Sequence, residues 1–403
     1  MTDNFDYRTY LRLLCICCAV VFGCYFGTYM RMPVVPLYAV TLGADTVEVG
    51  LINAAFLLTA GVLSLPLGLF SDRLGTKRIA AIGILILSAS SFLVALSRTP
   101  QQLIWIYLFS GVGLAAFGPT IMAFVANISP ITHLGRSYGW YTTALYCGMT
   151  LGPAMGGFVA QGAGFTLTFF ISGLSIFLTF WVLIFFLPGT GAGPPRQTAQ
   201  AGTTLAMVGQ LLRNRPLLGC WLGTLGGCFG LGLFLTFLPL HAKDQGLSVG
   251  QIGLVFATQG IVNALSRIPF GNLSDRVSNR NWLAVAGLLG VAGSIAAFGL
   301  ADRIGYFILC AAALGASMGL AFTSIGALTA EAAPPEFRGL AMGGYNAAIY
   351  LGMMLSSALM GPVIRSLGFT DGFLLTGLIN LILLAGFYLL IRDFSSRLKQ
   401  PVS

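Results

Sequence analysis

The sequence predicts an all-α membrane protein in which twelve transmembrane helices form two six-helix repeats of the same topology. The 403-residue chain is 56% hydrophobic and only 8% charged, whereas a soluble domain carries about 25% charged residues. Apolar runs of about 20 residues, each long enough to cross the hydrocarbon core of a bilayer as a helix, recur along the chain. The two halves of the sequence also match each other at a nearly constant offset.

The apolar runs place the spans in order along the chain. We expect transmembrane helices at 13–38, 48–70, 78–97, 103–126, 138–160, 166–188, 216–241, 249–271, 282–301, 305–330, 339–364 and 371–391. The segment between the sixth and seventh spans is rich in Gly, Pro, Thr and Gln, which is typical of a flexible connector. We therefore expect an N-terminal six-helix bundle at 1–188, a cytoplasmic linker at 189–215 and a C-terminal six-helix bundle at 216–403.

The second half repeats the first. Residues 36–73 align with 239–276 without a gap, and a later block matches with one further residue of offset. Two halves with the same order of spans indicate parallel structural repeats. The matched positions include Pro66 with Pro269, Gly68 with Gly271, Asp72 with Asp275, Tyr141 with Tyr345, and Tyr146 with Tyr350.

The basic residues predict the orientation. Of the 21 Lys and Arg residues, four fall in loops on one side of the predicted membrane and two fall within spans, while the other fifteen fall on the opposite side or in the tails. Cytoplasmic loops carry an excess of basic residues. Both termini should therefore be cytoplasmic in an integral, multi-pass plasma (inner) membrane protein. The net charge of +9 then faces anionic lipid rather than nucleic acid.

Two motifs carry a family resemblance. The stretch Gly68–Arg78, GLFSDRLGTKR, joins two spans by a short charged turn. The stretch Gly148–Gly157, GMTLGPAMGG, places a glycine at every fourth position of a predicted helix. With the twelve spans and the duplication, the chain resembles a major facilitator superfamily transporter. The first motif resembles that family's signature loop between helices 2 and 3. The second resembles the helix-5 signature of its antiporter branches, such as drug–proton antiporters.

The resemblance implies that both motifs belong to a conformational gate. Gly148, Gly152 and Gly156 share one helix face, which predicts a close contact between the two halves, with ordinary helix packing as the alternative. Asp72 would face the N-terminus of helix 11 and brace the outward-open state. The expected gate residues are Gly68, Asp72, Arg73, Gly75, Arg78, Gly148, Gly152, Pro153, Gly156, Asp275 and Arg276.

Polar groups inside the spans are the candidates for substrate contact, because such groups are costly in a membrane. Arg31 is one such candidate. The alternative is that it is a structural partner for Asp45, for Glu48 or for a carbonyl near the prolines of helix 1. We interpret Arg267 as a brace of the cytoplasmic end rather than a substrate contact. For the others, hydrogen-bonded helix packing is the alternative. The expected substrate-binding residues are Arg31, Tyr29, Asn53, Tyr141, Tyr146, Gln259, Asn263, Tyr345, Asn346 and Tyr350.

One departure from the antiporter pattern concerns proton handling. That branch often carries an Arg in helix 4, three or four residues before a Gly-x-Gly. Here Tyr107–Ser110 precede Gly111 and Gly113, and none of the twelve acidic residues lies clearly in the middle of a span. Proton coupling would therefore use groups near the span ends. The candidates are Glu48, Asp45, His241 and Glu331.

The sequence therefore predicts a secondary active transporter that works by alternating access. The leading hypothesis is efflux of an amphipathic drug-like or metabolite substrate, with exchange for protons as one option. The alternatives are uptake or facilitated transport of an organic anion, a lipid flippase, and a non-transporting membrane receptor.

No enzyme is expected, because the GxSxG match at Gly315–Gly319 lies inside a predicted span. The eight cysteines lie in spans and are interpreted as packing residues, so we expect no metal and no cofactor. The expected partners are a small-molecule substrate, protons where transport is coupled, and the lipid bilayer. We expect no nucleic acid and a monomeric chain.

Overall fold

The computed structural model describes residues 7–130, 133–188, 209, 211–277, 279–334 and 337–392. Among them, eleven helices are long and apolar enough to cross a membrane. One of these, Leu134–Phe186, has 53 residues and would be about 80 Å long if it were straight. Its Gly164 has φ 85° and ψ 169°, so two spans meet there end to end. The prediction of an all-helical protein with twelve transmembrane helices is confirmed.

The helices follow the predicted spans closely. The first half contributes α1 (Tyr7–Met30), α2 (Val34–Thr41), α3 (Thr46–Leu74), α4 (Thr76–Leu96), α5 (Pro100–Ile128) and α6 (Leu134–Phe186). The second half contributes α8 (Arg215–Asp244), α9 (Val249–Arg276), α10 (Arg280–Phe298), α11 (Ile304–Ala332), α12 (Arg338–Leu367) and α13 (Phe369–Ile391). The first predicted span, 13–38, is two helices in line, because residues 31–33 form a turn between α1 and α2.

The duplication extends to the backbone. Gly43 and Gly246, which are matched positions, have φ 91° and φ 83° before α3 and α9. Gly164 and Gly368, also matched, have φ 85° and φ 88° between the last two spans of each half. Glycine adopts a positive φ without the steric cost that a Cβ imposes. The same residue type therefore makes the same turn in both halves.

The starts of α3 and α9 are also matched. Asp45 accepts from the backbone N–H of Glu48, whose side chain accepts from the N–H of Asp45. Ser248 and Gln251 form the same reciprocal pair at the start of α9. Each such capping box satisfies two N–H groups that a helix end otherwise leaves without partners. The two equivalent helices thus begin at equivalent residues.

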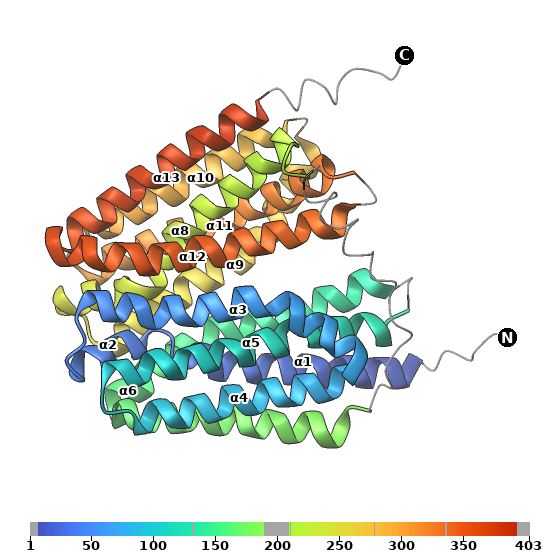
Figure 1. The fold of residues 1–403 in the computed structure, drawn as a ribbon. Helices are drawn as coiled ribbons and strands as arrows, with labels where there is room; N and C mark the ends of the chain where they lie inside the picture. The colour runs from blue at the N-terminus through green and yellow to red at the C-terminus, as the bar shows by residue number, and fades with distance from the viewer. Residues whose placement is uncertain are drawn as a thin grey trace, which may run out of the picture.

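The helices pack as two groups, α1–α6 and α8–α13, drawn in the lower and upper parts of Figure 1. We call them the first group and the second group. Two helix pairs make the main connections between them, α3 with α12 and α6 with α9, while α8 has smaller contacts with α2 and α3. Under the duplication, α3 matches α9 and the first part of α6 matches α12, so the two interfaces are equivalent. In Figure 1, α3 and α12 run side by side at one end and diverge toward the end at which α12 begins. The sequence predicts that this second end is cytoplasmic.

Candidate functional site

The α6–α9 interface begins near the predicted outer end. A Cβ built at Gly253 would lie only 2.7 Å from the carbonyl oxygen of Pro153, so the two backbones almost touch there. Toward the predicted cytoplasmic end, the guanidinium of Arg267 lies over the ring of Tyr146, with its Cζ 4.3 Å from the ring centroid. The two groups are therefore still in contact at the level of Tyr146.

The α3–α12 interface follows the same course. Near the outer end, the hydroxyl of Thr46 donates to the carbonyl oxygen of Gly361 at 2.9 Å. Further in, a Cβ built at Gly61 would lie 2.9 Å from the Cβ of Tyr350. Tyr146 and Tyr350 are matched positions of the duplication, so equivalent tyrosines mark the same level on both sides.

Four glycines beyond these tyrosines face open space among the described residues. No described residue of another element has an atom within 4 Å of a Cβ built at Gly135, Gly139, Gly339 or Gly343. These glycines lie in the first turns of α6 and α12 or beside them, at the predicted cytoplasmic end. The two groups are thus in contact at the predicted outer end and apart at the predicted cytoplasmic end.

Six tyrosines from both groups gather at the level where the groups part. The rings of Tyr25 and Tyr29 have centroids 6.1 Å apart, and Tyr29 lies within electrostatic range of Tyr146 and Tyr350. Tyr141 is buried and the others are half-buried. Tyr25 was not among the residues predicted from the sequence, although its spacing to Tyr29 places both on one face of α1. We call this set the tyrosine cluster: Tyr25, Tyr29, Tyr141, Tyr146, Tyr345 and Tyr350.

Arg267 adds a positive charge beside the cluster. Its Nε donates to Oδ1 of Asn263 at 3.0 Å, one turn earlier on α9. Tyr345 lies within electrostatic range of Arg267 and of Tyr146. Arg267, Asn263 and the two tyrosines therefore form one polar and aromatic patch that spans the two groups.

Arg31 points into the first group instead. It is only 2% exposed. Its Nη1 donates to Ser90 at 3.0 Å and to Ser91 at 3.1 Å, and its Nη2 donates to Ser110. Its Cζ also lies 5.6 Å from the centroid of the Tyr107 ring. The partners of Arg31 thus come from α4 and α5 and do not include the tyrosine cluster.

These contacts change the interpretation of the missing helix-4 arginine. Tyr107 and Ser110 lie on α5, the fourth span, where antiporters of the resembled branch often carry that residue. Here Arg31, in the turn between α1 and α2, brings a guanidinium to the same place. The described partners of Asp45 and Glu48 are other residues, so Arg31 is not seen paired with either.

The remaining predicted substrate residues have other surroundings. Asn53 is buried within α3. Gln259 donates from Nε2 to the sulfur of Met318 on α11, at 3.4 Å. Asn346 is exposed on α12. Their predicted role in substrate binding stays a prediction.

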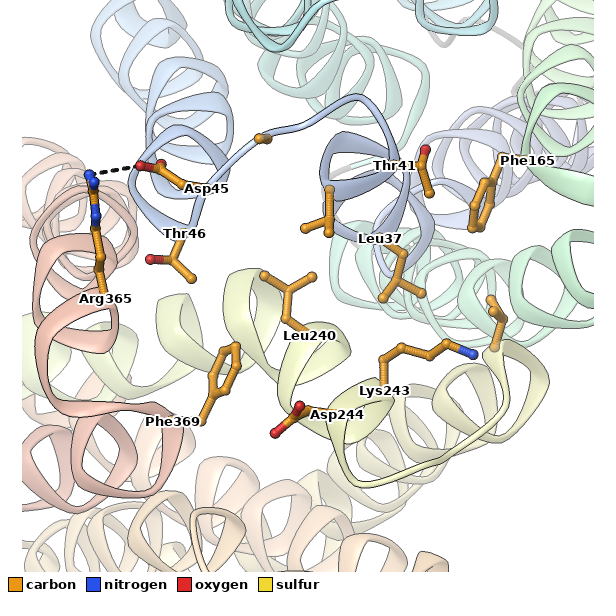
Figure 2. A pocket seen from close by; sticks show the side chains of 13 residues that line it. Leu37, Thr41, Asp45, Thr46, Phe165, Leu240, Lys243, Asp244, Arg365 and Phe369 are labelled. Carbon is orange, nitrogen blue, oxygen red and sulfur yellow. Dashed lines mark hydrogen bonds and ion pairs between the residues drawn. The ribbon is translucent and has the colours of Figure 1, made fainter.

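A charged contact closes the predicted outer end. The guanidinium of Arg365 on α12 donates to Oδ2 of Asp45 at 2.9 Å, across the two groups (Figure 2). At the equivalent place on the other interface, Gln161 accepts from the backbone N–H of Gly250 at 3.0 Å. The matched position of Arg365 is therefore neutral. Only one of the two equivalent contacts is an ion pair.

A pocket of about 580 Å³ lies beside this ion pair. In Figure 2, Leu37, Leu240 and Phe369 lie between Asp45 and Arg365 on one side and Lys243 on the other. Both groups contribute to its walls. The lining residues are Leu37, Val40, Thr41, Ala44, Asp45, Thr46, Phe165, Leu240, Lys243, Asp244, Val249, Arg365 and Phe369.

The other candidates for proton coupling are dispersed. Glu48 accepts from the side chain of Gln101 at 2.8 Å. His241 is buried, and its Nε2 donates to the carbonyl oxygen of Phe298 at 2.9 Å. Glu331 pairs with Arg280 at the opposite end of the molecule. These groups do not form one relay.

The turn after α3 contains a glycine with a positive φ. Gly75 has φ 94°. The next basic residue, Lys77, donates from Nζ to the carbonyl oxygens of Ile184 and Leu187 at the end of α6. Cations are favoured at helix C-termini. Arg78 and Arg276 are exposed, while the side chains of the predicted gate residues Asp72, Arg73 and Asp275 lie outside the described residues.

The glycine face of α6 packs within the first group. A Cβ at Gly148 would lie 2.7 Å from the carbonyl oxygen of Phe22, and one at Gly152 would lie 2.6 Å from that of Phe26. A Cβ at Gly156 would overlap the carbonyl oxygen of Met30. We expected this glycine face to contact the other half of the protein. It contacts α1 of the same half instead. The contact with α9, across the groups, is made instead by Pro153 and by Gly157, the residue that follows Gly156.

The ion pair at the outer end yields a first prediction. Asp45→Asn keeps a side-chain oxygen for the cap of α3 but removes the charge that holds Arg365. An exposed ion pair contributes about 0.2–1 kcal/mol, so we expect the outward-open population to rise by about 1.5- to 5-fold. Distances between spin labels at Arg98 and Asp302, in a cysteine-depleted background, would measure this.

The matched control for this prediction is an ion pair within one group. Asp302 lies 3.8 Å from its neighbour Arg303, and both are exposed. With labels at Arg98 and at the exposed Gly305, so that Arg303 stays in place, Asp302→Asn should leave the distances unchanged. An unchanged distribution in Asp45→Asn would show that the outer ion pair does not favour the present state.

Among the described residues, no group of three or more His, Cys, Asp or Glu side chains could hold a metal ion. All eight cysteines are free thiols distributed over several helices.

Comparisons with known proteins show which family has this architecture. The sequence model of the Major Facilitator Superfamily matches residues 17–250 and 221–402. An uncharacterized MFS-type transporter of Methanocaldococcus jannaschii, MJ1560, is 23% identical over 361 residues, which cover 88% of this chain and 92% of that protein. The quinolone resistance protein NorA of Staphylococcus aureus is 28% identical over 254 residues, which cover 62% of this chain and 64% of NorA.

Solved structures share the fold. A bacterial homologue of the human lysosomal transporter Spinster, in an inward-facing and unoccupied conformation, superposes with a TM-score of 0.81 at 15% identity and covers 99% of this chain and 100% of that chain. A point mutant of the nucleoside transporter NupG superposes with a TM-score of 0.79 at 15% identity, covering 95% of this chain and 99% of that chain. Since the family is one of transporters, the expectation that the chain is not an enzyme is also met. The chain belongs to the Major Facilitator Superfamily and is a multi-pass integral membrane protein of the secondary-transporter class.

Proposed function

We propose that this transporter exports an aromatic, amphipathic compound that binds at the tyrosine cluster. The observation that carries the proposal is the cluster itself, in which each of six tyrosines from both groups lies within electrostatic range of at least one of the others, where the groups part. Tyrosine offers an apolar ring and a polar hydroxyl, which suits a ligand with both characters. The similarity to the quinolone resistance protein NorA supports export as the direction.

The proposed membrane arrangement follows from the distribution of charge. With both termini in the cytoplasm, the present state is open to the cytoplasm and closed to the outside. Residues 1–188 and 216–403 would rock as two units joined by the linker 189–215, of which 189–208 and 210 lie outside the described residues. Closing the cytoplasmic end would bring the Gly68–Arg78 turn toward the start of α12, which is the gate role that the family resemblance implies.

We propose that the outer contact links proton binding to the conformational change. Asp45 and Glu48 lie at the start of α3, and Asp45 holds Arg365 of the other group. Opening of the outer end must separate that pair. Protonation of Asp45 would weaken the pair and favour the outward-open state, which couples proton binding to the conformational change.

Flux in proteoliposomes tests the proposed function. With an imposed pH gradient and a trapped pH indicator, a panel of aromatic dyes should move against proton flow. Tyr146→Leu and Tyr350→Leu should each raise the apparent KM by about 2- to 10-fold, because an aromatic contact is worth about 0.5–1.5 kcal/mol.

The control is Tyr306→Leu, since Tyr306 is exposed on α11 away from the tyrosine cluster. This variant should transport dyes like the wild type. The proposal fails when no dye moves, or when Tyr146→Leu, Tyr350→Leu and Tyr306→Leu all behave alike.

A further inference from the structure

We infer that the transported compound carries a carboxylate or a similar planar anion, and that Arg267 is its anchor. This inference rests on the proposed function, because it takes the tyrosine cluster as the substrate site. It differs from the sequence-based interpretation of Arg267 as a brace of the cytoplasmic end. It also places anion binding at Arg267 of α9, and not at Arg31 in the turn between α1 and α2.

The first argument is the unused side of the Arg267 guanidinium. Its Nε is held by Asn263, and its face lies on the ring of Tyr146. Within the part of the chain that the structure describes, Nη1 and Nη2 have no hydrogen-bond partner. A guanidinium presents five N–H donors in a rigid fork that matches the two oxygens of a carboxylate. Here one donor fixes the fork and the outer edge stays available for a ligand.

The second argument is the contrast with Arg31. Both Nη atoms of Arg31 are occupied by serine hydroxyls, and the side chain is fully buried in the first group. Arg267 is half-buried and lies between the groups. Of the two arginines within spans, only Arg267 is placed to meet a compound that enters between the groups.

The third argument is the charge around Arg267. Two described acidic residues near span ends form ion pairs with other arginines, Asp45 with Arg365 and Glu331 with Arg280. No described carboxylate lies in ion-pair contact with Arg267. A ligand carboxylate would therefore supply the missing counter-charge in a partly desolvated place, where a charge-assisted hydrogen bond is strong. A cationic compound would meet repulsion from Arg267 instead.

The fourth argument is the shape of the surroundings. Tyr146 lies under the guanidinium and Tyr345 lies within electrostatic range of it. A carboxylate on the Nη edge would direct the rest of the compound toward the tyrosines. The chemical class that fits is an aromatic carboxylic acid with its ring among the tyrosines and its carboxylate on Arg267.

A matched pair of ligands tests the inference. Binding of 2-naphthoate and of 2-naphthamide to the purified full-length protein at pH 7 would be compared by calorimetry. The two differ in charge but hardly in shape. We expect the wild type to bind naphthoate at least about 10-fold more tightly. Arg267→Gln should weaken naphthoate binding by about 10- to 100-fold and change naphthamide binding by less than twofold, since hydrogen bonds to a charged group are involved.

Two further variants complete the test. Arg267→Lys should give an intermediate naphthoate affinity, because one ammonium keeps the charge but not the bidentate geometry. Arg98→Gln removes one positive charge from an exposed loop and should change neither ligand. If Arg267→Gln is not recovered as a folded protein, the wild-type preference and Arg267→Lys decide.

The possible outcomes separate the inference from the proposed function. Equal wild-type binding of both ligands would overturn the inference and leave the aromatic site standing. Equal weakening of both ligands in Arg267→Gln would also overturn it, because a brace acts through the conformational equilibrium rather than through the ligand's charge. Binding of neither ligand to the wild type would overturn the aromatic site and the inference with it.

Discussion

Replacing Gly156 by alanine is expected to destabilise the protein severely. A Cβ at this position would overlap the carbonyl oxygen of Met30, the last residue of α1. Backbone cannot yield as the end of a flexible side chain does, so α1 and α6 would have to separate. Overpacking in a well-packed core costs about 1–3 kcal/mol, and a clash with backbone lies at or above the upper end of that range. The measurement is the thermal unfolding midpoint in detergent, with the monodisperse fraction as a second readout.

The same helix offers a matched control. Among the described residues, none outside α6 has an atom within 4 Å of a Cβ at Gly162, which lies six residues further along α6. Gly162→Ala should therefore be neutral or slightly stabilising, since alanine is a better helix former than glycine by about 1 kcal/mol. An unfolding midpoint of Gly156→Ala equal to that of Gly162→Ala would contradict the close packing of α6 on α1.

The sequence predicts this face but not its neighbour. Spacing of four residues places Gly148, Gly152 and Gly156 on one side of a helix, whatever that helix packs against. The neighbour is α1, within the same group, and contact across the groups falls to Gly157. A rotation of about 100° along the helix separates these two faces. Only the tertiary arrangement decides which partner each face meets.

For polar residues, too, the sequence predicts candidates but not the residues that surround them. The sequence predicts five of the six tyrosines of the cluster as candidates for substrate contact, because polar groups are costly inside spans, but it does not predict Tyr25. It does not predict the surroundings of Arg31, because Ser90, Ser91 and Ser110 are 59 to 79 residues away along the chain. No local pattern connects a cation with serines on two other helices. The roles of the predicted gate and substrate residues remain predictions that the experiments above address.

The second large effect concerns Arg31. We expect the conservative substitution, to lysine, to destabilise the protein more than substitution to methionine does. We expect Arg31→Lys to lower the free energy of unfolding by about 2–4 kcal/mol, since it loses one or more hydrogen bonds to a charged group. The shorter lysine keeps the buried charge, but a single ammonium cannot reach the serines of α4 and the serine of α5 together. The charge would then be left buried with too few partners.

Arg31→Met should be much milder, because it removes the charge together with its need for partners. The hydroxyls of Ser90 and Ser91 also donate to the carbonyl oxygen of Leu87, so they keep a partner without the guanidinium. Replacement of a buried ion pair by apolar side chains of similar volume is often neutral or stabilising, and we expect the same of this buried cation. Unfolding by SDS titration should therefore rank the wild type and Arg31→Met close together, with Arg31→Lys well below both.

The order of the two variants tells what the guanidinium does. If Arg31→Met is as unstable as Arg31→Lys, the hydrogen bonds to the serines outweigh the cost of burying the charge, and Arg31 stabilises the first group. If the predicted order holds, the charge itself contributes little or nothing to stability. A buried cation of that kind persists for a reason other than folding, and its position beside Tyr107 and Ser110 on the fourth span would then point to a role in transport.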